Sequence, residues 1–327
     1  MKTLNKSAIA QTDSSHPETA LSLGDYAYYI VREQYQSIIK LKKQVLADED
    51  PEHLHHMRVG TRRLRTALQV FERAIVLPKA AQSKRVGSLA RILGALRDLD
   101  VQIADLQKTY YPQVPSAEQK ILNTWIHHLE KQRRKAFATV KDALTHSHYE
   151  KLKAAYDVWF AKPVYTELAQ LPLTMLLPDL LSPLLSTLLL HPGWLVATDG
   201  LSAATNHTLH DLRKACKHAR YQTEFFIPFY GETLGTWLEE VKLLQAKLGK
   251  LQDSQVLSEL LQENRAKDQD LPGLRQVIQQ MQTSVMNDWD TLRLKYLEPD
   301  FRKHLYSLIL QPGTADAKFL RKIAKSQ

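Results

Sequence analysis

Apolar residues along most of the chain recur every three to four positions. The segment HHMRVGTRRLRTALQVF, which begins at His55, and the segment LARILGALRDLDV, which begins at Leu89, show this spacing clearly. It matches the 3.6-residue period of an α-helix, whereas the alternation of apolar and polar residues typical of half-buried strands does not occur. We therefore predict an all-α fold.

Prolines divide this helical pattern into segments. Pro51 is placed to open a helix and Pro78 to follow one, while Pro112 and Pro115 precede a long helical stretch. Pro272 has the corresponding place in the second half of the chain. Each half then has room for about four helices, and helical hairpins of this length pack most simply as bundles. We predict two four-helix bundles related by an internal pseudo-two-fold axis.

The boundary between the two bundles is expected in the proline-containing stretch between Pro163 and Pro183. The predicted segments are a disordered tail over 1–20, a first bundle half over 21–172, a second over 173–312 and a basic tail over 313–327. The apolar run 171–190 is interrupted by three prolines and an aspartate, so we interpret it as a core helix and not as a membrane span.

Two pairs of segments align at one offset of 155 residues, which indicates an internal duplication. In the first pair, HHMRVGTRRLRTALQVF from His55 aligns with HDLRKACKHARYQTEFF from His210. In the second pair, LARILGALRDLDV aligns with LQAKLGKLQDSQV. Matching positions include Arg58 with Arg213, Arg65 with Arg220, Phe71 with Phe226, Gly94 with Gly249 and Asp98 with Asp253. Two motifs with one offset and no gap are hard to obtain by chance.

The basic charge of the chain is concentrated in one region. The net charge is +9, and residues 53–97 alone contain ten Lys or Arg residues and a single acid, Glu72. The rest of the chain is balanced. An excess focused in this way favours a polyanionic partner more than a general solubilising role.

On a helix, the basic residues of each copy fall on one face. In the first copy this face holds His55, Arg58, Arg62, Arg65 and Gln69, and in the second it holds His210, Arg213, Lys217 and Arg220. Successive cations lie about 5 Å apart along such a stripe, which suits a linear chain of phosphates. Arginine can hold two oxygens of one phosphate at once because its planar fork donates in parallel.

A solvated basic face is the alternative to an anion-binding one. A solvated face normally carries acids four residues away to relieve repulsion, yet no acid occurs from His55 to Phe71, and in the second copy Asp211 alone interrupts the pattern. We therefore predict anion binding. The predicted binding residues are His55, Arg58, Arg62, Arg63, Arg65, Lys84, Arg91, His210, Arg213, Lys214, Lys217, Arg220, Lys247 and Lys250.

The two repeated histidines have three interpretations: a structural histidine at a helix start, an anion contact or a metal ligand. The histidine clusters lack the HxxxH and HExxH spacings that place two imidazoles on one metal, so metal binding is the weakest of the three. The second motif is interpreted as structural, with close helix approach at Gly94 and a carboxylate paired to arginine. The pairs to expect are Asp98 with Arg58 or Arg62, and Asp253 with Arg213. The basic clusters at 131–135 and 318–325 are expected to be solvated faces.

The order HxxRVxxRRLR, LGxLRDxDV and then HxxRKxxKxxRY resembles the conserved histidine α-helical domain family, known as CHAD, from about Gly24 to Ser307. The resemblance implies two pseudo-symmetric four-helix bundles, a basic central cavity, binding of inorganic polyphosphate and association with polyphosphate granules. No ExExK segment of a triphosphate tunnel domain occurs, so we expect a stand-alone binder. The second copy departs from the pattern in charge, since His218, Ala246 and Gln252 stand where the first has Arg63, Arg91 and Arg97. We expect the first copy to bind more strongly.

The predicted function is non-catalytic binding of polyphosphate without a cofactor or metal, and the alternative is an RNA-binding helical module. A phosphoanhydride-cleaving enzyme is disfavoured because no GxxxxGK[ST] loop or acidic metal cluster occurs. The start of the chain has no apolar stretch of signal-peptide length and Cys216 is the single cysteine, so we expect a cytoplasmic protein with no membrane association. Oligomeric state stays open. The histidines are expected to strengthen binding as the pH falls from 8 to 6.

Overall fold

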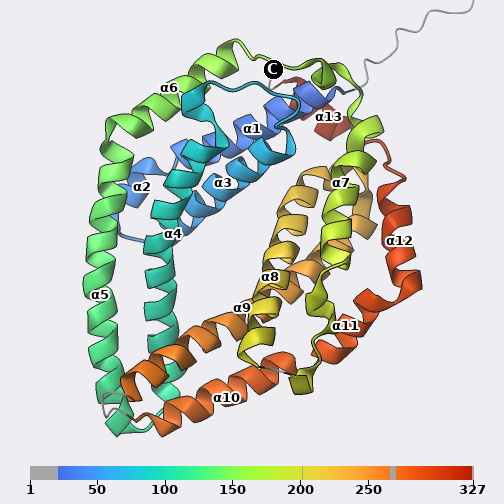
Figure 1. Cartoon of the computed structure of the whole chain (residues 1–327). Helices are drawn as coiled ribbons and strands as arrows, with labels where there is room; N and C mark the ends of the chain where they lie inside the picture. The colour runs from blue at the N-terminus through green and yellow to red at the C-terminus, as the bar shows by residue number, and fades with distance from the viewer. Residues whose placement is uncertain (1–20, 201, 266–269, 326–327) are drawn as a thin grey trace, which may run out of the picture.

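The computed structural model describes residues 21–200, 202–265 and 270–325, and these residues form helices joined by short connections (Figure 1). No β-strand occurs in the described part of the chain, where the extended pairing is limited to two isolated bridges, Ser22 with Pro172 and Ile75 with Tyr165. The prediction of an all-α fold is confirmed.

The first half of the chain contributes helices α1 to α6. They are α1 (Leu23–Ile39), α2 (Lys42–Ala47), α3 (Pro51–Val70), α4 (Ser83–Asp105), α5 (Ser116–Thr145) and α6 (Ser147–Ala161). Helix α3, which carries the first basic motif, begins as expected at Pro51, and the Asp50 side chain caps it by accepting a hydrogen bond from the backbone N–H of Glu52.

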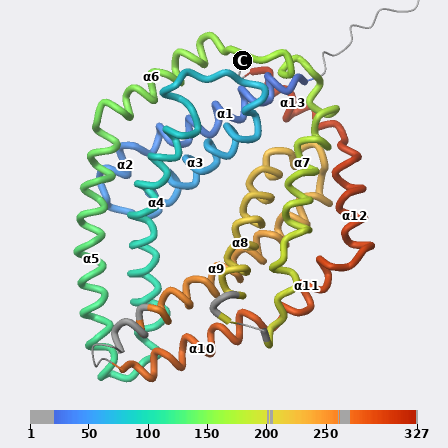
Figure 2. Tube along the Cα trace, in the orientation of Figure 1, coloured from blue at the N-terminus to red at the C-terminus, as the bar shows by residue number. Residues whose placement is uncertain are grey.

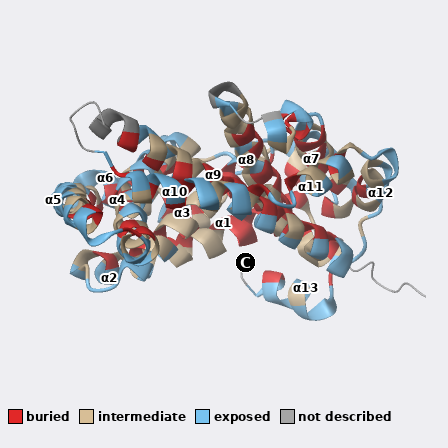
Figure 3. Cartoon of the chain, turned by 90° about the horizontal axis from the view of Figure 1, so that it is seen from below, coloured by how far each residue is buried: buried red, intermediate tan, exposed pale blue. Residues whose placement is uncertain are grey.

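The second half contributes helices α7 to α13. They are α7 (Leu173–Leu189), α8 (Ala203–Thr223), α9 (Gly231–Arg265), α10 (Pro272–Met286), α11 (Trp289–Leu297), α12 (Pro299–Ile309) and α13 (Ala317–Ala324). Helix α8 carries the second basic motif and begins with a capping box between Ser202 and Thr205. In a view from below, α5 and α12 lie at opposite ends of the molecule (Figure 3).

The main hydrophobic core runs without interruption through both halves. Phe71 and Phe226, which occupy equivalent places in the repeat, pack against each other with ring centroids 6.1 Å apart. Tyr26 of α1 contacts both rings and donates a hydrogen bond from its hydroxyl to the carbonyl oxygen of Phe225. The two repeated helices therefore converge at their C-terminal ends on one buried aromatic cluster.

A second, smaller core joins the halves at the far end of the molecule. Leu106, Tyr110 and Leu122 of the first half pack with Leu274 and Val277 of the second. Figure 2 shows α9 and α10 extending to the end of α4 and the beginning of α5. The halves thus share two hydrophobic cores, and α3 of the first half also contacts α8 of the second.

A buried carboxylate strengthens this second contact. Glu118 of α5 is 7% exposed, and its two oxygens accept hydrogen bonds from the backbone N–H groups of Gly273 and Leu274, at 2.7 and 2.8 Å. These N–H groups have no partner within α10 because they belong to its first turn. Glu118 therefore caps a helix of the other half.

Helix α7 contains the apolar run. It continues through Pro178 and Pro183 and buries a row of leucines, among them Leu177, Leu181 and Leu185. By length and composition alone the segment Leu173–Leu195 could cross a membrane, and 33% of its most apolar stretch is buried inside the structure. Its packing against α8 and α12 supports the interpretation as a core helix.

The two basic clusters expected to be solvated contain residues that tie the fold together. Arg133 of α5 is ion-paired with Asp48 at 2.6 Å and with Asp100 at 2.8 Å. In α13, Ile323 is 1% exposed and Phe319 packs on the ring of Tyr26. The expectation of a solvated face therefore fails for Arg133, whose acidic partners lie far away in the sequence. The other basic residues of the two clusters are exposed as expected, namely Lys131, Arg134, Lys135, Lys318, Arg321, Lys322 and Lys325.

Candidate anion-binding groove

The two repeated helices, α3 and α8, contact each other and line one continuous hollow. A cavity of 200 Å³ is lined by Arg62, Arg65, Thr66, Gln69, Lys214, Lys217, His218 and Tyr221. A neighbouring cavity of 380 Å³ is lined by Arg58, Arg62, Arg65, Ser83, Lys84, Gly87, Ala90, Arg91 and Lys217. The two cavities share Arg62, Arg65 and Lys217, and we call them together the basic groove.

Arg62 lies at the junction of the two cavities. Its guanidinium carbon is 4.5 Å from the ring centroid of Tyr221 on α8, and its Nε is buried without a hydrogen-bond partner among the described residues. Burial is the main cause that lowers the pKa of this arginine, with the neighbouring Arg58 and Arg220 adding to the effect. A buried guanidinium with unused donors favours an anion placed against it.

Lys217 of α8 lies opposite the arginines of α3 and borders both cavities. Burial, followed by the charges of Arg62, Arg58 and Arg213, lowers the pKa of this lysine to about 8. Among the described residues no carboxylate lies within ion-pair distance of its ammonium group. An anion in the groove would supply the missing counter-charge.

Arg58 forms the predicted contact with the second motif. It pairs with Asp98 of α4 at 3.2 Å, and a side chain at Gly94 would come within 3.5 Å of its Nε. In the second half Arg213 lies in the same way over Gly249, where a Cβ would be 3.3 Å from its Nε. The prediction for Asp98 is confirmed. The predicted ion pair of Arg213 with Asp253 is not formed in the described chain. Burial raises the pKa of Asp253, and the nearby charge of Arg213 partly offsets this rise.

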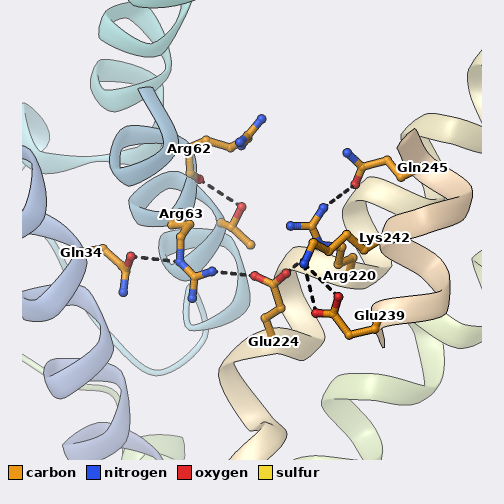
Figure 4. Close-up of polar contacts among 9 residues, drawn as sticks. Gln34, Arg62, Arg63, Arg220, Glu224, Glu239, Lys242 and Gln245 are labelled. Atoms are coloured by element: carbon orange, nitrogen blue, oxygen red, sulfur yellow. Dashed lines mark hydrogen bonds and ion pairs between the residues drawn. The ribbon is translucent and has the colours of Figure 1, made fainter. Parts of the chain in front are cut away.

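Arg63 and Arg220 are directed into an internal ion-pair cluster, not into the 380 Å³ cavity (Figure 4). Glu224 accepts hydrogen bonds from Arg63 at 2.5 Å and from Arg220 at 2.7 Å. Arg63 also donates to Gln34, and Arg62 points away from this cluster. Arg63, which was predicted to bind the anion, therefore pairs with an acid from the other half of the chain, and the absence of acids from His55 to Phe71 does not reveal this partner.

The remaining predicted lysines and arginine divide into three groups. Lys84 and Arg91 of α4 are exposed and line the basic groove, and Lys214 lines it while pairing with Asp211 at 2.9 Å. Lys247 pairs with Asp288 at 2.9 Å outside the groove. Lys250 lines a different cavity of 420 Å³ together with Asp105 and Asp253.

The two repeated histidines are not among the residues that line the groove in the described chain. Burial is the largest cause that lowers the pKa of both His55 and His210 below 6.5, which keeps them neutral at pH 7. No group of three side chains suited to a metal ion occurs in the part of the chain that the structure describes. His218 and Tyr221, which sequence reasoning missed, do line the groove.

An all-helical chain whose repeated helices face one cationic groove defines the class of protein. A family model described as the CHAD domain matches residues 29–262, and the chain belongs to this family. Among solved structures, the CHAD domain from the plant Ricinus communis is similar, with 23% identity, a TM-score of 0.59 and coverage of 93% of this chain and 98% of that one. PptA from Streptomyces chartreusis is similar with 14% identity, a TM-score of 0.56 and coverage of 84% and 98%. These structures support the fold. A search of curated proteins found no match.

Proposed function

We propose that the protein binds inorganic polyphosphate in the basic groove without cleaving it. The observation that carries this proposal is the composition of the lining: it holds cations from both halves of the chain, and its described residues include no carboxylate. The lining cations are Arg58, Arg62, Arg65, Lys84, Arg91, Lys214 and Lys217. Arg58 and Lys214 have acidic partners, but the other five form no ion pair among the described residues, and an anion in the groove would relieve their repulsion.

The length of the groove suits a linear polyanion. From Arg58 to Gln69 the axis of α3 rises about 16 Å, and lining residues recur at each turn. Arginines can hold the oxygens of successive phosphates in pairs, while Lys217 supplies a point charge from the opposite wall. A chain with one negative charge per repeat matches this arrangement better than a single phosphate.

Nucleic acid is the second candidate, and the lining disfavours it. Single-stranded nucleic acid is usually held by aromatic side chains on which bases stack. Tyr221 is the aromatic residue in the described lining, but it is 7% exposed, and the guanidinium groups of Arg62 and Arg220 lie over its ring. We propose a binding role without catalysis because carboxylates of the kind that hold Mg²⁺ for phosphoryl transfer are missing from the described lining.

We also propose that the two halves are bundles related by a pseudo-two-fold axis. The equivalent placements of Arg58 over Gly94 and of Arg213 over Gly249 support this relationship. A cytoplasmic location with association to polyphosphate granules is part of the same proposal, and it rests on membership of the family.

Titration with long-chain polyphosphate at several salt concentrations tests the proposal. We expect saturable binding whose log–log slope against salt reflects several displaced counterions, by analogy with nucleic acids, where each phosphate contact adds about 0.7–0.9. RNA at equal phosphate concentration should displace the bound polyphosphate poorly. No binding at moderate salt, or ready displacement by RNA, would contradict the proposed ligand.

A further inference from the structure

Lys217 differs from the other lysines of the groove in its surroundings. It is half-buried and borders both cavities, whereas Lys84 and Lys214 are exposed. The charged and titratable groups that act on it or share its cavities are Arg58, Arg62, Arg65, Lys84, Arg91, Asp98, Arg213, Lys214, His218 and Tyr221. Of these, Asp98 carries the opposing charge and is already paired with Arg58.

These surroundings increase the fraction of Lys217 that is present as the neutral amine. A lysine whose pKa is lowered from 10.5 to about 8 has about a 300-fold larger neutral fraction at pH 7 than an ordinary lysine. The neutral amine is the nucleophilic form, and burial beside other cations is a known way to activate a lysine. Lys217 therefore combines a reactive amine with a wall of phosphate-binding side chains.

We propose that Lys217 is a site of covalent acylation by small acyl phosphates. Arg62 and Arg65 line the same two cavities as the amine, so they would hold the phosphate group of such a molecule and leave its carbonyl carbon near Nζ. The cationic side chains suit a phosphate group, and the nucleophilic amine suits an electrophilic carbon. An acyl phosphate carries both, joined through one oxygen atom.

The reaction is a simple acyl transfer. The lone pair of Lys217 Nζ attacks the carbonyl carbon, a C–N bond forms, and the C–O bond to phosphate breaks. One proton leaves the nitrogen and passes to the departing phosphate or to water. The products are an amide on Lys217 and inorganic phosphate, and neither an oxidant nor a metal is needed. The cations around Lys217 would stabilise the negative charge that develops on the departing phosphate.

Acylation would also change the groove. It removes a positive charge shared by both cavities and adds an uncharged group there. That this lowers polyphosphate affinity rests on the proposed function, whereas the acylation itself does not. A bound polyanion would cover the amine and raise its pKa, so it should protect Lys217.

Site-resolved mass spectrometry of the full chain treated with acetyl phosphate at pH 7.5 tests this proposal. Two other lysines serve as internal references: Lys84, exposed in the same groove, and Lys303, exposed on α12. We expect Lys217 to be acetylated at least tenfold faster than Lys303 and faster than Lys84. Excess pyrophosphate should slow the labelling of Lys217 and leave that of Lys303 unchanged.

The variant Arg62→Gln separates activation of Lys217 from chance reactivity. It removes a phosphate-binding group and a charge that lowers the pKa of Lys217, so labelling of Lys217 should fall at least fivefold while that of Lys303 stays constant. Equal labelling of Lys217 and Lys303 in the wild-type chain would overturn the proposal, as would an unchanged Lys217 rate in this variant. Because labelling is measured without polyphosphate, a failure of polyphosphate binding would be seen separately and would leave this result standing.

Discussion

Arg62 of α3 and Tyr221 of α8 stack across the boundary between the two halves of the chain, with 4.5 Å between the guanidinium carbon and the ring centroid. A cation over an aromatic face is held in place without being neutralised. Arg220 of the second motif lies over the same ring at 4.6 Å, but Glu224 balances its charge. Arg62 forms no ion pair among the described residues, where Glu224 acts on it only from a longer distance, so its charge is available to the groove.

Arg62 and its neighbour Arg63 should have different roles, Arg62 in binding and Arg63 in stability. Arg62→Ala should weaken polyphosphate binding at least tenfold, about 1.4 kcal/mol, because a charge-assisted contact in the groove is lost. Arg63→Ala should leave affinity within twofold but lower the free energy of unfolding by about 1–3 kcal/mol, since it strips a half-buried partner from Glu224. Binding titrations and denaturant unfolding measure the two effects. Arg134→Ala, an exposed arginine of α5 outside the groove, is the control. Equal effects of Arg62→Ala and Arg63→Ala on affinity would argue against the groove.

The pH dependence of binding should follow Lys217. Its pKa of about 8 means that the ammonium form gains population as the pH falls from 9 to 7, so affinity should rise over that window and then level off. The histidines should contribute less to this pH dependence than their number suggests. Burial lowers the pKa of His55, His210 and His218 below 6.5, so they gain their charge only at lower pH. Affinities measured at constant ionic strength check this. Lys217→Arg should abolish the rise between pH 9 and 7, and its persistence in that variant would point to another group.

Replacing Lys217 should stabilise the free protein while impairing binding. Because the folded-state pKa is lowered, folding disfavours the charged form, and this cost is fully present below about pH 8 and vanishes above the unfolded pKa of 10.5. Lys217→Met should therefore raise the free energy of unfolding at pH 7 by about 1–2 kcal/mol, a figure reduced for partial exposure. Denaturant unfolding at pH 7 and pH 10.5 measures this gain, which should shrink at the higher pH. If Lys217→Met is less stable than the wild type at pH 7, the charge of Lys217 does not destabilise the folded protein.

The ion pair between Arg58 and Asp98 should moderate binding. Asp98→Asn releases Arg58 toward the groove and removes an acid near Lys217, so polyphosphate affinity should increase about threefold to tenfold. The stability cost should stay below about 1 kcal/mol because the Asp98 side chain is 63% exposed. Asp288→Asn, which removes the partner of Lys247 outside the groove, is the matched control and should leave affinity unchanged. If Asp98→Asn binds polyphosphate more weakly than the wild type, the ion pair holds Arg58 in the position that binding needs.

The cap that Glu118 provides to α10 should contribute to the stability of the fold. Glu118→Ala leaves the part-buried N–H of Gly273 and the buried N–H of Leu274 without an acceptor and should lower the free energy of unfolding by about 1–3 kcal/mol. Glu118→Gln keeps one acceptor and should cost less. Thermal and denaturant unfolding compare the two. Equal stability of Glu118→Ala and the wild type would mean that the contact between Glu118 and the first turn of α10 contributes little to stability.

Local patterns in the sequence predicted the parts of this structure that depend on nearby residues. The helical period, the start of α3 at Pro51 and the pairing of Arg58 with Asp98 follow from spacing, capping and the repeat. Arg62, Arg65 and Lys217 were also predicted for the binding face, and the structure brings them together.

The rotation of each helix against its neighbours could not be predicted from the motif itself. The repeat suggested that α8 presents His210, Arg213, Lys217 and Arg220, whereas the groove is lined by Lys214, Lys217, His218 and Tyr221, a stripe at positions i, i+3, i+4 and i+7 turned by about one residue. Packing of Phe226 against Phe71 in the shared core and pairing of Glu224 with Arg63 of α3 fix this rotation. Both contacts join segments that are distant in the sequence or buried, so the local charge pattern does not reveal them.

The central claim is that cations from both halves hold one polyanion in one groove. A double-mutant cycle on long-chain polyphosphate affinity, with Arg62→Ala and Lys217→Ala singly and together, tests it most directly. We predict at least a tenfold loss of affinity for each single variant, and a loss of binding free energy for the double variant that differs from the sum of the single losses by more than about 0.5 kcal/mol. The control Arg134→Ala should bind within twofold of the wild type. If Arg62→Ala and Lys217→Ala also bind within twofold of the wild type, the claim is contradicted.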